Sequence, residues 1–133
     1  KLTGVYGMNS HYILYVSNQE QSSRFYENVL CIKPVLEVPG MTEFQPSNQC
    51  KLGLMPYVGI RKLLGEDITC PVSASKNPNS ELYLLVDNPT EYHQRSLDNG
   101  ALELSGVRMM DWGHVVGYSK DLDGHVLAFA AAC

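Results

Sequence analysis

The two side chains best placed for acid–base chemistry, His11 and Glu81, occupy equivalent positions in two similar stretches of the chain. These stretches, His11–Cys31 and Glu81–Ala101, lie seventy residues apart. An imidazole and a carboxylate that meet in a cleft can exchange a proton with a bound carbonyl compound. An inward carboxylate is costly unless it is paired, so we expect Glu81 to contact Lys51, His11 or water. Without a metal to stabilise an enolate, such a pair lacks the largest catalytic contribution, and binding is favoured over catalysis.

The other side chains expected in this cleft are apolar or aromatic, which is typical of a site for a small organic molecule. From the strand alternation they are Ile13, Tyr15, Met55, Tyr83, Leu85 and Val126, with the cationic Lys51 beside them. Trp112, on a loop with flexible Met residues, can cover a planar ligand or pack on the sheet rim. The alternative for the whole set is a cleft filled by its own side chains. His93 and His114 are expected to be ordinary surface residues.

Several classes of protein are excluded by composition and by missing motifs. There is no G-x-S-x-G elbow, P-loop or dinucleotide fingerprint. The net charge of −4 leaves no basic stripe for a nucleic acid. The longest apolar run, Val126–Cys133, is too short to span a membrane, and no secretory leader is visible. The sequence therefore predicts a cytoplasmic protein with neither a nucleic-acid partner nor a membrane partner.

The four cysteines show no C-x-x-C pair and no Cys/His cluster with zinc spacing. They are Cys31, Cys50, Cys70 and Cys133. We expect free, mostly buried thiols in a reducing compartment. A disulfide to Cys133 stays open.

The first half of the chain predicts a strand, a helix and three further strands. Asn18 is the expected N-cap of the helix, with Gln21 in the capping-box position, and Pro34 is expected to end it. Pro39-Gly40 and the stretch from Pro46 to Asn48 predict turns. The strands are expected over Ser10–Val16, Val35–Val38, Met41–Gln45 and Cys50–Met55. A short helix over Tyr57–Gly65 and a loop over Glu66–Asn79 should follow.

The second half repeats this order. Asn88-Pro89 gives an N-cap and a proline at the first helical position, and Asn99-Gly100 gives a C-cap. Asp123-Gly124 predicts a tight turn before the last strand. The strands are expected over Glu81–Val86, Ala101–Val107, His114–Ser119 and His125–Ala130.

The order is therefore β-α-β-β-β twice, which predicts an α+β fold of two βαβββ modules. Each module is a curved mixed sheet with a helix on its outer face, and the concave faces form the cleft. At 133 residues we expect a single domain, 1–133. Module one is expected over about 8–56, a linker over about 57–79 and module two over about 80–131.

These residues resemble the vicinal oxygen chelate superfamily, which includes lactoylglutathione lyases, bleomycin-resistance proteins, extradiol dioxygenases and fosfomycin-resistance enzymes. The resemblance covers nearly the whole chain, although Leu122 stands where the family usually has proline. It rests on His11–Val16, Arg24–Leu30, Leu82–Asn88, Asn99–Ala101, Trp112-Gly113 and Tyr118–Phe129. It implies the two-module fold, and it implies a homodimer, either domain-swapped or side by side. The family mixes metalloenzymes with metal-free binding proteins, so the fold does not assign a reaction.

The resemblance also implies where a metal would sit, with one ligand from the first and one from the last strand of each module. His11 and Glu81 match the two first-strand positions. The last-strand positions, usually glutamate, fall on Gly53 and Ala128, which have no donor atom. The alternation of Leu52 and Leu54 around Gly53, and of Leu127 and Phe129 around Ala128, points both toward the cleft. Two protein ligands are fewer than the three that catalytic zinc sites use.

We therefore expect a metal-free protein of the glyoxalase/bleomycin-resistance type that holds a hydrophobic or aromatic compound between its modules. Such a protein sequesters or carries its ligand, as drug-resistance proteins of the family do. The alternative is a lyase, isomerase or dioxygenase that binds Ni, Zn, Fe or Mn through His11, Glu81 and an unidentified third ligand.

Overall fold

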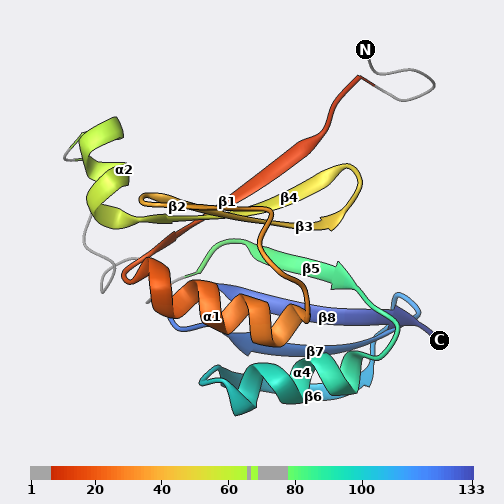
Figure 1. Ribbon diagram of the computed structural model, residues 1–133. Helices are drawn as coiled ribbons and strands as arrows, with labels where there is room; N and C mark the ends of the chain where they lie inside the picture. Colours follow the sequence, from red (N-terminus) through yellow and green to blue (C-terminus); the bar gives the residue numbers. More distant parts are fainter. Residues whose placement is uncertain (1–6, 66, 69–77) are drawn as a thin grey trace.

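The computed structural model describes residues 7–65, 67–68 and 78–133 (Figure 1). In chain order the elements are β1 (Ser10–Val16), α1 (Gln19–Leu30), β2 (Leu36–Val38), β3 (Met41–Ser47), β4 (Cys50–Pro56), α2 (Tyr57–Leu64), β5 (Glu81–Leu85), α4 (Pro89–Asp98), β6 (Leu102–Met109), β7 (His114–Lys120) and β8 (Val126–Ala132). The expected order of elements is confirmed. The loop expected over Glu66–Asn79 lies largely outside the described residues. No helix among the described residues is long and apolar enough to cross a membrane.

Helix α1 begins where the sequence predicts and ends earlier. The Asn18 side chain accepts a hydrogen bond from the Gln21 backbone N–H at 2.9 Å, as an N-cap does. At the other end Cys31 takes a left-handed conformation with φ 58°, and its N–H bonds to the Glu27 carbonyl. The helix therefore ends at Leu30, four residues before Pro34, because the C-cap at Cys31 terminates it upstream of the proline.

Helix α4 and the last hairpin follow their sequence signals. Asn88 accepts from the Glu91 N–H at 3.2 Å, and Pro89 stands at the first turn. Asn99 is the C-cap, followed by Gly100 at φ 107°. Gly124 has φ 89° in the turn before β8, and its N–H bonds to the Asp121 carbonyl. A side chain is strained at such positive φ, so both glycines are required by the backbone.

The two sheets share one topology, which confirms the expected repeat of the β-α-β-β-β order. Their strand orders are β1-β4-β3-β2 and β5-β8-β7-β6. In each sheet the first and last strands of the module pair in parallel, and the remaining pairs are antiparallel. β1 and β5 are therefore both edge strands. β3 includes Pro46, which the sequence placed in a turn; the register shifts between Phe44 and Ser47, and such an irregularity tolerates a residue without an N–H.

A shared hydrophobic core joins the modules. It combines α1 side chains such as Phe25 and Val29 with Leu52 of β4 and with Leu127 and Phe129 of β8. The helices also contact each other directly: Arg95 Nε donates to the Val29 carbonyl at 3.0 Å. Figure 1 shows α1 between the first sheet and α4. Each sheet thus packs one face on this core and leaves the other face open, and the open faces carry the candidate site residues.

Three of the cysteines are described, and they are more exposed than the sequence suggested. Cys31 and Cys133 are exposed and Cys50 is half-buried, and all three are free thiols. The expectation of mostly buried thiols was therefore wrong for these three. Cys31 serves as a helix C-cap and Cys133 follows the last strand, so neither position faces the core. Cys70 lies outside the described residues.

Candidate functional site

A pocket of about 500 Å³ lies where the two modules meet, at the edge strands β1 and β5. Four of the predicted ligand-binding residues line it: Ile13, Tyr15, Glu81 and Val126. The other described lining residues are Tyr12, Leu14, Tyr57, Pro78, Asn79, Ser80, Leu82, Asp123, Gly124 and His125. Its volume is that of sites which enclose drug-sized molecules.

Aromatic side chains form much of the pocket wall. Tyr15 of β1 and Tyr57, the first residue of α2, meet edge to face with ring centroids 6.0 Å apart. Tyr12 joins the two modules across the pocket through a 3.1 Å hydrogen bond between its hydroxyl and Ser80 Oγ. Tyrosines give flat apolar surface with a polar tip, which suits a ligand with a ring. Tyr57 was absent from the predicted site because the sequence placed it in a linker.

The turn between β7 and β8 closes one side of the pocket and is organised by Asp121. This carboxylate is 7% exposed and accepts the backbone N–H groups of Asp123 and His125, each at 2.9 Å. It also accepts the Tyr26 hydroxyl at 2.5 Å. Burial raises the pKa of Asp121, and this outweighs the nearby imidazole of His125 and the hydrogen bonds, which lower it. Burial, followed by the Asp121 charge, holds the pKa of Tyr26 well above its ordinary value.

Two residues of this turn, Asp123 and His125, form hydrogen bonds to β1 and to Ser17, the residue that follows it. Asp123 Oδ1 accepts both the backbone N–H and the hydroxyl of Ser17, at 2.9 and 2.7 Å. His125 Nε2 lies 2.8 Å from the Tyr15 carbonyl, which accepts its proton. His125 thereby occupies a main-chain acceptor on the edge strand β1 beside the pocket.

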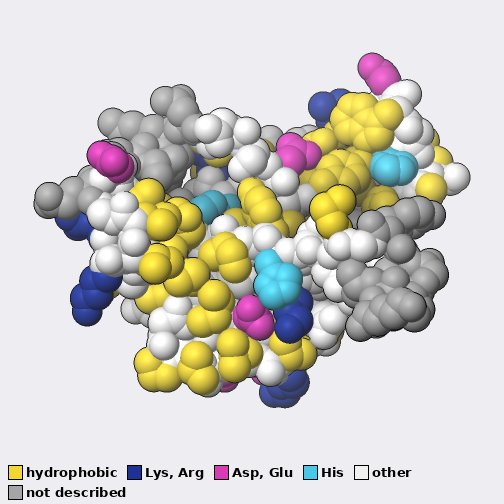
Figure 2. Space-filling view, turned by 90° about the horizontal axis from the view of Figure 1, so that it is seen from above, with side chains coloured by type: hydrophobic (Ala, Val, Ile, Leu, Met, Phe, Trp, Pro, Cys, Tyr) yellow, Lys and Arg dark blue, Asp and Glu magenta, His cyan; other side chains and the backbone are white. Residues whose placement is uncertain are grey.

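The open face of the first sheet carries a charged cluster centred on Glu43, a residue that sequence reasoning missed. The Glu43 side chain is 13% exposed and lies 3.8 Å from His11 Nδ1 and 3.7 Å from Lys51 Nζ. Lys51 therefore pairs with Glu43 and not with Glu81, the partner expected from the sequence. The cause is register: His11 and Lys51 are direct partners, and Glu43 stands opposite Gly53 on the next strand. Figure 2 shows this side of the molecule. A histidine, an acidic and a basic side chain lie against one another there, with hydrophobic side chains around them.

The two positions where the resemblance implies metal-binding carboxylates face away from the helices, as predicted, and both are filled. A Cβ at Gly53 would lie 2.6 Å from Ile13 Cδ1 and 3.3 Å from Met41 Sδ. Ala128 is fully buried in a cluster with Tyr83 and Tyr118. In the part of the chain that the structure describes, no group of three His, Cys, Asp or Glu side chains is arranged to hold a metal. Neither Gly53 nor Ala128 supplies the side-chain donor that the resemblance implies at these positions.

The open face of the second sheet carries an aromatic network built on Tyr83. The Trp112 indole N–H donates to the Tyr83 hydroxyl at 2.9 Å, and that hydroxyl lies 2.6 Å from His114 Nδ1. Trp112 is 56% exposed, so it covers no core. His114 was expected to be an ordinary surface residue and is instead half-buried in this network. Burial is the main cause that raises the pKa of neighbouring Tyr118, followed by the charge of Glu81.

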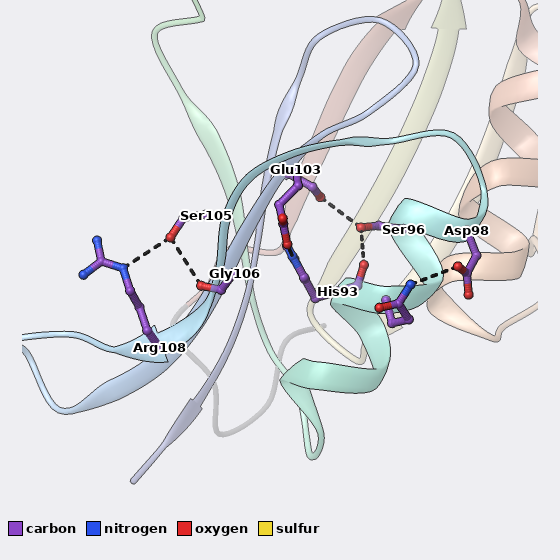
Figure 3. Close-up of polar contacts among 9 residues, drawn as sticks. His93, Ser96, Asp98, Glu103, Ser105, Gly106 and Arg108 are labelled. Atoms are coloured by element: carbon purple, nitrogen blue, oxygen red, sulfur yellow. Dashed lines mark hydrogen bonds and ion pairs between the residues drawn. The ribbon is translucent and has the colours of Figure 1, made fainter.

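The remaining predicted residues are dispersed. Met55 pairs with Tyr15 on the open face of the first sheet, and Leu85 is 68% exposed beside a separate cavity of about 320 Å³. His93, the other histidine expected at the surface, is buried between α4 and the second sheet, and its Nε2 lies 2.8 Å from Glu103 Oε2 (Figure 3). Gly117 makes room for this ring, because a Cβ there would lie 2.8 Å from His93 Nδ1.

Comparison with known proteins gives a family for the whole fold. The family model described as the Glyoxalase/Bleomycin resistance protein/Dioxygenase superfamily matches residues 10–129. No curated protein matches the chain.

Several solved structures share the fold at low sequence identity. A glyoxalase-related enzyme from Fulvimarina pelagi is 23% identical with a TM-score of 0.79, and the match covers 95% of this chain and 88% of that one. A glyoxalase/bleomycin resistance protein/dioxygenase family enzyme from Burkholderia phytofirmans PsJN is 11% identical with a TM-score of 0.78, covering 92% and 97%. TioX from Micromonospora sp. ML1 is 16% identical with a TM-score of 0.68, covering 96% and 100%.

Proposed function

This chain belongs to the Glyoxalase/Bleomycin resistance protein/Dioxygenase superfamily, and we propose that it is a metal-free member that binds a hydrophobic or aromatic small molecule between its modules. It acts by sequestering or carrying this compound, as a drug-resistance protein would. The observation that carries the proposal is the pocket at the module junction, with its tyrosine walls and its volume of about 500 Å³.

The filled carboxylate positions support binding without a metal. Ile13 and Met41 side-chain atoms lie beside Gly53, and Tyr83 and Tyr118 pack against the cluster that contains Ala128. A bound cation would need donors at these two positions, and the side chains of glycine and alanine supply none. Lys51 adds to this argument, because its ammonium already neutralises Glu43 beside His11.

One observation favours the alternative of a lyase, isomerase or dioxygenase. The Glu43 carboxylate lies 3.8 Å from His11 and is a second possible metal ligand beside it, one that the sequence analysis did not identify. Among the described residues, His11 and Glu43 supply two ligands where three are required. Glu81, the other expected ligand, lines the junction pocket, and His11 does not line it. Of the two functions, binding therefore has more support from the described residues.

Binding at the junction pocket is tested with N-phenyl-1-naphthylamine, a neutral fluorophore whose emission rises in apolar surroundings. We expect saturable enhancement with the wild-type protein. Tyr15→Ala should weaken binding about fivefold, because one aromatic contact of roughly 1 kcal/mol is lost. Tyr15→Phe keeps the ring and should bind within about twofold of wild type. Circular dichroism melting of each variant separates a lost contact from a lost fold.

Two results would contradict this site. The first is no saturable enhancement in a folded wild-type protein. The second is a loss of binding with Trp112→Ala and none with Tyr15→Ala, because that pattern would place the ligand on the open face of the second sheet.

We also propose that two copies associate through their open sheet faces. These faces expose apolar side chains, such as Val38 at 45% and Trp112 at 56%, which a partner would cover. Light scattering on a sizing column should give twice the mass of one chain. Val38→Glu should shift the protein toward one chain, whereas Leu122→Glu, at a similarly exposed position (43%) in the β7–β8 turn, should not. A single-chain mass for the wild type at micromolar concentration would refute the dimer.

The free thiols Cys31, Cys50 and Cys133 support a cytoplasmic location. Exposed thiols such as Cys31 and Cys133 stay reduced where glutathione and thioredoxin act. We therefore place the proposed binding activity in the cytoplasm.

A further inference from the structure

We propose that the junction pocket selects an organic cation, a molecule with a ring and a protonated amine. This inference rests on the proposed function, since it names the ligand class of the same pocket. Three features carry it: the sign of the charges in the pocket, the absence of a described ion pair to either carboxylate, and the aromatic walls.

The charged groups that line the pocket are acidic. Glu81 on β5 and Asp123 in the turn before β8 are the carboxylates, and no Lys or Arg is among the described lining residues. In the described part of the chain, neither carboxylate forms an ion pair. The chain as a whole carries a net charge of −4, which adds to the negative potential that a cation meets on approach.

The two carboxylates differ in what they can do. Asp123 already accepts three protein donors, two from Ser17 and one from Ser22 at 3.4 Å, so it contributes charge and holds the pocket wall in place. Glu81 is exposed and makes no hydrogen bond to another described side chain. Glu81 is therefore the group that a ligand ammonium would contact directly.

Two other acidic side chains, Glu43 and Asp121, are already paired or hydrogen-bonded within the protein. Glu43 is held between His11 and Lys51 on the open face of the first sheet. Asp121 is buried under hydrogen bonds from Tyr26 and the turn backbone. The carboxylate that remains available to a ligand is therefore Glu81, in the lining of the junction pocket.

The tyrosine walls favour the same ligand. The face of a phenol ring attracts a cation through its quadrupole, in addition to offering apolar surface to a ring. Tyr12, Tyr15 and Tyr57 all line the pocket. No described Lys or Arg lines the pocket, and the lining imidazole of His125 is engaged by the Tyr15 carbonyl through Nε2. A carboxylate beside aromatic faces in such surroundings binds a protonated amine in preference to a neutral or anionic molecule of the same shape.

Displacement of N-phenyl-1-naphthylamine by three compounds with one indole ring tests this selectivity. Tryptamine is a cation at pH 7, tryptophol is neutral and indole-3-acetate is an anion. We expect tryptamine to displace the fluorophore at a concentration about fivefold lower than tryptophol, and indole-3-acetate to need a higher concentration than either. A fivefold preference is what one partly screened charge pair gives, and it should shrink in 1 M NaCl.

Glu81→Gln should bring the tryptamine and tryptophol concentrations within about twofold of each other, while fluorophore binding itself persists. Asp111→Asn removes an exposed carboxylate elsewhere and should leave the preference unchanged. Equal displacement by all three compounds would overturn the cation inference while leaving the pocket as a binding site. No fluorophore binding at all would instead overturn the proposed function. A preference that survives Glu81→Gln would also overturn the assignment to Glu81.

Discussion

Replacing Ala128 with glutamate should lower the free energy of unfolding by about 3 to 5 kcal/mol, the cost of an uncompensated buried charge. Ala128 is fully buried, and its direct partners on the two neighbouring strands, Tyr83 and Tyr118, pack against the same cluster. The substitution restores the residue type that the family's metalloenzymes carry at this position. We nevertheless expect no gain of Ni, Zn, Fe or Mn, because the carboxylate would have to displace the two rings first. Urea unfolding and elemental analysis of the purified protein measure the two outcomes.

Two variants separate charge from volume in this result. Ala128→Gln adds nearly the same volume without a charge and should cost less than Ala128→Glu. Ala132→Glu places the same carboxylate on the same strand and face at an exposed position, and it should change stability by about 0.5 kcal/mol or less. Stoichiometric metal in Ala128→Glu, or in the wild type, would show that the site is built for a cation.

Asp121→Ala should cost about 3 kcal/mol, because it leaves the Tyr26 hydroxyl and two backbone N–H groups without their acceptor. It should also weaken binding of N-phenyl-1-naphthylamine, since the turn that Asp121 organises lines the pocket. Asp121→Asn retains an acceptor and the shape of the side chain, and should cost less. If Asp121→Ala were as stable as wild type, the turn would not depend on this carboxylate.

The pH dependence of stability follows from the raised pKa of Asp121. A raised pKa means that the folded protein binds this proton more tightly than the unfolded chain does. The contribution of Asp121 is therefore fully present below its ordinary pKa of 3.8 and is lost as the pH rises through the raised value. The stability of wild type relative to Asp121→Asn should increase as the pH falls through that window. A difference that is constant or decreases on acidification would contradict burial as the dominant cause.

The fold was largely predictable because its signals are local. Caps such as Asn18 and Asn88, the Asn99-Gly100 end and the Asp123-Gly124 turn each fix a boundary without reference to the rest of the chain. The structure differs from the prediction where a rare backbone conformation or the pairing of distant strands sets the boundary of an element. Cys31 ended α1 in a left-handed conformation that few non-glycine residues adopt, and the irregular end of β3 accommodated Pro46.

The sequence predicts which face of a sheet the side chains of the candidate site lie on. It predicts less well which residues they contact. Alternation along a strand placed Gly53 and Ala128 away from the helices, and the structure agrees. Strand alternation alone cannot say which residue lies across from which, because that depends on register between strands. Glu43 was missed for this reason: its partners His11 and Lys51 are met only once β3, β4 and β1 are aligned.

The packing around Gly53 constrains how this lineage could change. A side chain added at position 53 would meet Ile13 Cδ1 at 2.6 Å and Met41 Sδ at 3.3 Å, so a glutamate there requires these two side chains to shift. Changes at positions 53 and 13 should therefore be energetically coupled, since a smaller residue at 13 removes the atom that a side chain at 53 would meet first.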